Sequence, residues 1–359
     1  VVTIAFVAVL RDREVQIPQR FAGKVISEIN SISTTFIIEA SSVHLSLDEG
    51  FLPEIKISNV DLFYSNREPI LSFDSLITNF SLADLFFGKF LVSSITLDSA
   101  NLSIVRNKDG SLNLGLRGEN TSEPDYFDAV GILRKLDELF TSDEMERFEN
   151  LNLFGLTAQL EDQRTDKRYT IDGGRLRMNL EDQAMVMSFD LALLSGGQGA
   201  STVEGNLKRT VGQLDGEFGL LFNDFLAQDI ANLSPEFGLL SVLEAPISGA
   251  FRGSFNKDGN LNPMNATLKM GSGLFKPTSD IKAIAFNSAR TYFSYFPGSG
   301  EINIDEISFN SKDLRATADG NLFIEDIRDI PGTFVSQLNF TDLQTGGFGF
   351  LNNAISSNS

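Results

Sequence analysis

The stretch that decides the fold is residues 51–114, FLPEIKISNVDLFYSNREPILSFDSLITNFSLADLFFGKFLVSSITLDSANLSIVRNKDGSLNL. In its first part Ile55 and Ile57 alternate with polar or charged neighbours, and the alternation slips by one residue after Asn59. Alternation of period two predicts a strand with one apolar face, and a slip in phase predicts a β-bulge. The stretch therefore predicts a sheet that is apolar on one face only.

The second part of this stretch changes its pattern twice. Residues 81–86 predict one helical turn capped by Ser81, because a serine oxygen can accept the first free backbone N–H groups of a helix. Sheet alternation then returns over residues 92–107. Asp109-Gly110 predicts a hairpin turn into residues 112–114.

This order of parts resembles the N-terminal region of the AsmA-like proteins, most closely the YhdP-type branch. The positions that carry the resemblance are Ser81, Leu82, Leu85, Gly88, Ile95, Leu97, Ala100, Leu102, Ile104, Arg106, Asp109 and Gly110. A second block, residues 247–322, is similar to a later part of the same family, whereas the middle of the chain agrees only in its pattern. The resemblance implies a taco-like β-groove that carries lipid acyl chains across the periplasm of a Gram-negative bacterium.

Composition limits the partners. Among 359 residues there are 29 Lys and Arg against 48 Asp and Glu, a net charge of −19, which disfavours nucleic acid. The chain has no Cys, so it has neither disulfides nor thiolate metal sites. Its 31 Phe stand against 5 Tyr and no Trp, a composition that suits a dry lining more than a hydrogen-bonding interface.

Changes in pattern along the chain predict a division into regions. These are residues 1–10, an N-terminal β region (11–118), a linker with an amphipathic helix (119–150), a β-meander (151–345) interrupted by helix at 225–243, and a tail (346–359). The resemblance implies that residues 1–10 are the stump of an N-terminal membrane anchor, and that the tail is truncated. The first region is shorter than the roughly 20 residues of a spanning helix, so a buried strand or a signal-peptide remnant is the alternative.

Two further segments have helical or strand spacing near the beginning of the chain. Residues 18–31 predict a short amphipathic helix close to a membrane surface. Residues 33–47 predict a strand pair that carries the single histidine, His44. A lone histidine with no Cys and no second His beside it is best interpreted as an ordinary strand residue.

Residues 127–140 predict a longer helix, because apolar side chains recur at helical spacing. Those side chains are Phe127, Val130, Leu133, Leu136, Leu139 and Phe140. A membrane-surface helix is disfavoured by the acidic residues that follow, so we expect this helix to cap an open end or edge of the sheet.

Asp-Gly pairs mark two later turns. The stretch Asn256-Lys257-Asp258-Gly259 lacks the first acid and the final glutamate of a calcium loop, so it predicts a hairpin turn. Asp319-Gly320 predicts the closing turn of a similar hairpin.

No catalytic motif is found. The chain lacks the nucleophile elbow, the zinc-protease helix, the P-loop and the dinucleotide-binding glycine pattern. A carboxylate-pair glycosidase is disfavoured, since no cluster of acids with Trp or Tyr suggests sugar binding. We therefore expect no enzyme activity, no cofactor and no metal.

The prediction is a mainly β protein, a long curled antiparallel sheet with a taco-like groove and a few short helices capping or edging it. Candidate groove-lining residues are Ile55, Ile57, Leu71, Phe73, Ile95, Leu97, Leu102, Ile104, Leu176, Met178, Met187, Phe189, Leu191, Phe251, Phe255, Ile302 and Ile304. The resemblance implies that the ligands are phospholipid acyl chains, which the protein conducts between the inner and outer membranes. It also implies that the protein is anchored in the inner membrane, that most of the chain lies in the periplasm, and that it supports outer-membrane biogenesis. The alternatives are a structural or assembly factor that pairs with strands of outer-membrane proteins, with further periplasmic or outer-membrane protein partners unknown, and a periplasmic enzyme.

Overall fold

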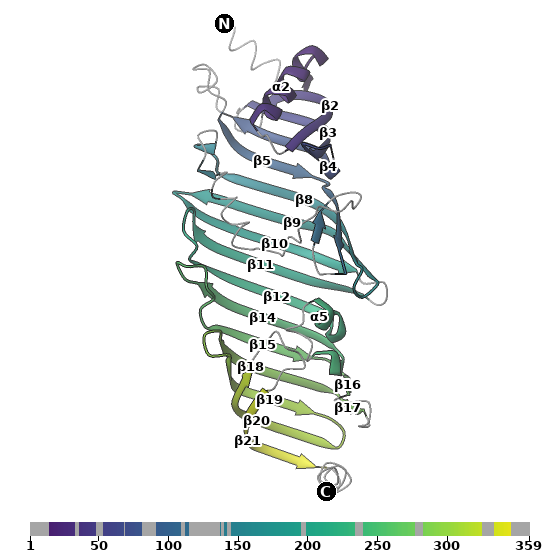
Figure 1. The fold of residues 1–359 in the computed structure, drawn as a ribbon, viewed down its shortest axis with the longest axis vertical. Helices are drawn as coiled ribbons and strands as arrows, with labels where there is room; N and C mark the ends of the chain where they lie inside the picture. Colours follow the sequence, from purple (N-terminus) through teal and green to yellow (C-terminus); the bar gives the residue numbers. More distant parts are fainter. Residues whose placement is uncertain are drawn as a thin grey trace. The chain divides into compact units, whose positions relative to one another are not determined.

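The protein is mainly β, as predicted, with sheets of long strands and two α-helices in the part described (Figure 1). The computed structural model describes residues 14–32, 36–47, 53–67, 69–80, 91–108, 112–114, 137, 140–141, 145–194, 199–233, 240–276, 283–324 and 334–345. The chain divides into two compact units, residues 1–200 with 206–214, and residues 201–205 with 215–359.

In the part of the chain that the structure describes, the labelled elements of the first unit are one helix and ten strands, followed by a strand whose residues fall in both units. They are β1 (Val15–Gln16), α2 (Gln19–Ile32), β2 (Phe36–Leu47), β3 (Pro53–Tyr64), β4 (Pro69–Phe80), β5 (Val92–Asp98), β6 (Asn101–Arg106), β7 (Leu112–Leu114), β8 (Asn150–Asp162), β9 (Lys167–Glu181), β10 (Ala184–Leu194) and the shared β11 (Ala200–Thr210). Strands β2 to β5 pair antiparallel in chain order, as do β8, β9 and β10. The predicted all-antiparallel sheet needs one correction, since β8 pairs parallel with both β5 and β6. A parallel partner requires a long crossover, and the chain between β7 and β8 provides one.

The phase slip predicted at Asn59 is present, but it is not a bulge of one strand. Ile57 and Val60 both lie in the same buried cluster, and Asn59 has a positive φ of 50°. The register of β3 with β2 and with β4 continues without a shift across this point. All three strands therefore change phase at the same level, where the Asn59 amide donates to Ser41 Oγ at 2.8 Å.

The helix expected at residues 18–31 is confirmed as α2, and it packs on the sheet. Its Ala22 and Ile26 contact a cluster of buried side chains from β2, β3 and β4. Residues 36–47 form a single strand, so the predicted strand pair is wrong. The strand stays unbroken because it pairs along its whole length with β3.

The second unit repeats the antiparallel order with longer connections. Its elements are β12 (Gly216–Leu226), α5 (Ala227–Leu233), β13 (Leu243–Glu244), β14 (Pro246–Phe255), β15 (Met264–Met270), β16 (Gly273–Phe275), β17 (Ile284–Phe286), β18 (Ser288–Phe296), β19 (Glu301–Asn310), β20 (Leu314–Ile324) and β21 (Phe334–Thr345). Strands β12, β14, β15, β18, β19, β20 and β21 pair in that order. A small separate sheet is formed by β13, β16 and β17.

Of the two expected turns, one is confirmed and one is wrong. Asn256 Oδ1 accepts the backbone N–H groups of Asp258 and Asn260, and Gly259 has a φ of 81°, so this stretch is a hairpin turn between β14 and β15. Asp319-Gly320 instead lies within β20. Gly320 has a φ of 152°, and a Cβ there would lie 2.0 Å from the Gln337 carbonyl oxygen, so the glycine is required by close approach to β21.

Several expectations fall outside the described residues. They are the anchor at 1–10, the helical turn at 81–86, the turn residues Asp109-Gly110, most of the helix at 127–140, and the tail at 346–359.

Candidate functional site

The strands of the second unit place their apolar side chains on one face. The register brings Leu220, Phe251, Ala266, Phe293, Ile304, Gly320 and Leu338 opposite one another, one from each successive strand from β12 to β21. Seven strands at about 4.8 Å spacing extend this row by roughly 29 Å. We call the surface that contains it the second-unit apolar face.

Neighbouring rows on this face have the same character. The row on one side contains Phe222, Gly249, Leu268, Thr291, Ile307, Ala318 and Phe340, and the next contains Ile247, Met270, Ala289, Phe309, Ala316 and Leu343. On the other side of the first row lie Phe218, Gly253, Tyr295, Ile302 and Leu322. These rows contain no charged side chain.

The opposite face of the same strands is polar and charged. It carries Arg252, Lys269, Arg290, Glu306 and Asp319, each in register with another residue of that face. Arg290 and Glu306 approach each other to 4.0 Å. This face also carries the exposed apolar side chains Leu221, Phe323 and Val335. The two faces therefore differ in charge, which is absent from the apolar rows and present on the opposite face.

Most side chains on the second-unit apolar face are only half-buried. Along β21 they are more exposed still, with Phe340 at 59% and Leu343 at 55%. Water contact with this much apolar surface is unfavourable, and contiguous exposed apolar patches are characteristic of binding surfaces.

Glycines on this face leave space for the aromatic rings, because they have no Cβ. A Cβ at Gly249 would lie 2.7 Å from the Phe222 ring and from the Thr267 carbonyl oxygen, so the ring lies against bare backbone. Phe222 also stacks on Phe251 at 5.7 Å. Aromatic rings therefore lie directly over strand β14.

One border of the face is closed by the small sheet and α5, which lie at the same end of the strands in Figure 1. Buried Phe286 of β17 packs on Phe309 at 5.5 Å between ring centroids. Phe225, just before α5, meets Phe222 edge-on at 5.9 Å.

The first unit has a similar apolar face, but large parts of it are covered. Under α2, Val43 and Ile57 are 0% exposed. Over β9 and β10, Phe140 and Phe148 pack on Met178 and Met185. These two regions are protein core.

The predicted lining residues therefore fall into three groups. Ile55, Ile57, Phe73 and Met178 are buried members of the two core clusters. Leu71, Leu97, Ile95 and Met187 are partly buried and pack against those clusters. Leu102, Ile104, Leu176, Phe189, Leu191, Phe251, Phe255, Ile302 and Ile304 are half-buried.

The lining residues predicted from the sequence do not include many residues of the second-unit apolar face. Residues on the same face that it omitted include Phe218, Phe222, Phe293, Ile307, Phe309, Leu338, Phe340 and Leu343. Their alternation was visible in the sequence, but the side of the sheet on which they lie depends on the strand register.

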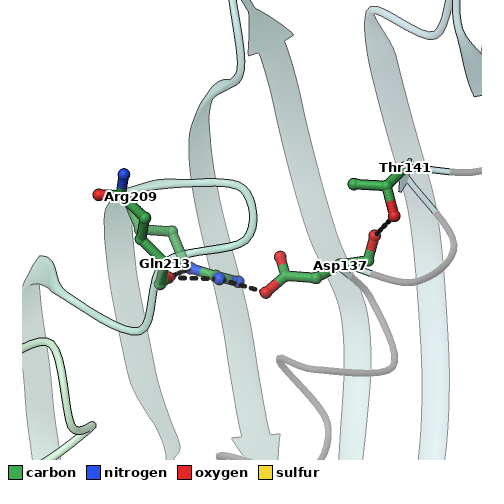
Figure 2. A network of polar contacts seen from close by, with 4 residues as sticks. All are labelled: Asp137, Thr141, Arg209 and Gln213. Carbon is green, nitrogen blue, oxygen red and sulfur yellow. Dashed lines mark hydrogen bonds and ion pairs between the residues drawn. The ribbon is translucent and has the colours of Figure 1, made fainter.

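Figure 2 shows a buried polar contact in the first unit. Arg209 Nη2 donates to Asp137 Oδ2 at 2.6 Å and to the Gln213 carbonyl oxygen at 2.6 Å, and the Arg209 side chain is 1% exposed. Elsewhere in this unit, burial and then the charge of Arg164 lower the pKa of Arg106, while Asp162 opposes the shift.

The described residues contain no group of three or more side chains suited to a metal ion. Within the same residues, neither helix combines the length and apolar character needed to cross a bilayer. Comparison with family models, curated proteins and solved structures gave no match.

Proposed function

We propose that this protein binds phospholipid acyl chains on its apolar sheet face and conducts them between the inner and outer membranes of a Gram-negative cell. On this proposal it is anchored in the inner membrane, acts in the periplasm and supports outer-membrane biogenesis. The transport role and the two membranes come from the resemblance to AsmA-like proteins. The ligand chemistry is supported independently by the second-unit apolar face.

The single observation that carries the proposal is the sidedness of β12 to β21. Rows of apolar side chains run across the strands without a charge, and most of these side chains remain half-exposed. The hydrocarbon core of a bilayer is about 30 Å thick, so one acyl chain spans about half of it. A face extended by roughly 29 Å is therefore longer than one chain.

The energetics favour binding without polar recognition. Each methylene removed from water contributes about 0.8 kcal/mol. Because the rows repeat similar side chains, a chain displaced by one strand finds an equivalent surface. Such a face would retain an acyl chain and still allow it to slide.

Strand pairing with a client protein is the second candidate, and β21 favours it. Exposed edge strands are usually protected by Lys or Pro, and residues 334–345 contain neither. Phe340 and Leu343 of this strand are largely exposed. A client strand with apolar residues on the same side could extend the rows.

Photocrosslinking from adjacent residues of β14 tests the proposal. The chain, carrying a photoreactive amino acid at Phe251 or at Arg252, is incubated with vesicles of phosphatidylethanolamine and phosphatidylglycerol, and adducts are identified by mass spectrometry. Phe251 lies on the apolar face and Arg252 on the charged face, so the two positions are matched controls one residue apart.

Lipid adducts from position 251 and none from position 252 are expected. Equal adducts from both positions, or none from 251 and from a second apolar position such as Ile304, would refute lipid binding at this face. Adducts between position 340 and a strand of another protein in cells, without lipid adducts at 251, would support the strand-pairing alternative.

A further inference from the structure

The first unit contains a segment that covers its apolar face and is fixed at two points. Its described part, Asp137, Phe140, Thr141 and residues 145–149, is called here the cover segment. At one end the Glu149 backbone bridges two strands, donating to the Ser93 carbonyl at 2.8 Å and accepting from the Leu180 N–H at 2.7 Å. At the other end Asp137 binds Arg209 (Figure 2).

Between these two points the cover segment occupies apolar surface. Phe140 and Phe148 stack at 5.3 Å between ring centroids, and both are buried against Met178 and Met185. Met178 and Met185 belong to the same side of β9 and β10 as Leu176 and Phe189, because paired positions in the register alternate sides. The rings therefore lie where an acyl chain would lie if the face were uncovered.

The attachment at Asp137 is a buried ion pair with unused hydrogen-bonding capacity. Arg209 Nη1 and Asp137 Oδ1 are both buried without a hydrogen-bond partner. Burying charges costs free energy that only complete pairing recovers, and apolar residues of similar volume often serve as well or better. An ion pair of this kind adds little to the stability of a permanently packed core. It suits a contact that opens, because both charged groups regain their hydration when they separate.

We infer that the cover segment is an autoinhibitory strap, which the Arg209–Asp137 ion pair holds closed and which acyl chains displace from β9 and β10. This inference rests on the proposed function. Phenylalanine rings and lipid methylenes are similarly apolar, so exchanging one for the other on Met178 and Met185 changes little hydrophobic free energy. The position of the equilibrium is then set mainly by the ion pair.

Cysteine labelling measures the opening, because the natural chain has no cysteine. Met185→Cys reports on the surface beneath the strap, since Met185 is 0% exposed. Val43→Cys, equally buried but under α2, reports on general unfolding. Each is combined with Asp137→Asn, which leaves Arg209 without a charged partner, and with the apolar double change Asp137→Leu with Arg209→Met.

We expect Asp137→Asn to raise the maleimide labelling rate at position 185 by about tenfold or more while position 43 stays protected. The double change should return position 185 to slow labelling. A photoreactive residue at Leu176 should gain phospholipid adducts from vesicles in the Asp137→Asn chain and lose them in the double variant.

Unchanged labelling at position 185, or an equal rise at positions 185 and 43, would overturn the strap. Faster labelling at 185 without more lipid adducts at 176 would also overturn it, and if position 251 still captured lipid the proposed function would stand. Failure at both 176 and 251 would refute the proposed function itself.

Discussion

Strands β2 to β4 and strands β14 to β20 have the same alternation of apolar and polar residues in sequence. Their apolar faces nevertheless differ in how far they are exposed to solvent. In the first unit Val43 and Ile57 are completely buried beneath α2. In the second unit equivalent alternation leaves Ile302 and Ile304 half-exposed. Alternation thus defines a face, and a separate element decides whether that face becomes core.

The covering elements contribute few side chains, yet these side chains exclude water from whole clusters on the sheet. Ala22 and Ile26 of α2 close one cluster, and Phe140 and Phe148 close the other. Once covered, a side chain loses its contact with water and becomes costly to change. The comparison predicts that the same substitution will have different effects in the two units.

The largest difference is expected for a charge placed on each face. Ile57→Asp buries an unpaired carboxylate in a position of 0% exposure, and we expect loss of 5 kcal/mol or more, about the whole stability of a domain. Ile304→Asp, at a half-exposed position, should cost about 1 to 2 kcal/mol. Chemical unfolding monitored separately in each unit measures both effects.

The effect of Ile304→Asp on lipid capture should be large even though its effect on stability is small. Ile304→Asp should remain folded and yet lose adducts at position 251, because the carboxylate lies in the same row. If Ile304→Asp unfolded the second unit as completely as Ile57→Asp unfolds the first, the contrast between covered and uncovered faces would be wrong.

A smaller effect is expected where glycine makes room for a ring. Gly249→Ala places a methyl group 2.7 Å from the Thr267 carbonyl oxygen, which belongs to the backbone and cannot move aside freely. We expect a loss of about 1 to 3 kcal/mol, as is usual for overpacking, measured by thermal unfolding. Gly298→Ala is the matched control, because nothing lies within 4 Å of the added Cβ and its backbone is not strained.

Gly249→Ala also sharpens the comparison of the faces. If it shifted the Phe222 ring without loss of stability, the face would be loosely packed. A loss confined to Gly249→Ala would show that the face is ordered in the absence of a cover.

Local alternation was enough to predict the strands, and β3, β4, β14 and β19 lie where the sequence places them. It was not enough for relations between distant strands. The parallel pairing of β8 with β5 and β6 joins segments separated by a long connection that has no period of its own. Asp319-Gly320 has a common turn composition, but Gly320 serves close approach between β20 and β21.

The candidate site was predicted in part for the same reason. Sequence gives the apolar side of each strand, so the predicted residues lie on apolar faces, but it does not show what covers them. Ile57 and Ile304 have identical side chains and similar neighbours in sequence. Ile57 belongs to a buried cluster to which Ala22 and Ile26 of α2 also contribute, and α2 is separate from the strand of Ile57 in the sequence. The strand pattern alone therefore does not show that Ile57 is covered.

The smallest effect is expected on the charged face of the second unit. Arg290 and Glu306 lie 4.0 Å apart with side chains about half exposed, at 48% and 46%. Exposed ion pairs contribute little, so Arg290→Gln should change the free energy of unfolding by about 0.5 kcal/mol or less. Adducts at position 251 should be unchanged, because Arg290 projects from the opposite side of the sheet. A clear loss of lipid adducts in Arg290→Gln, with stability preserved, would mean that the charged face takes part in lipid capture, and binding would then depend on more than the apolar rows.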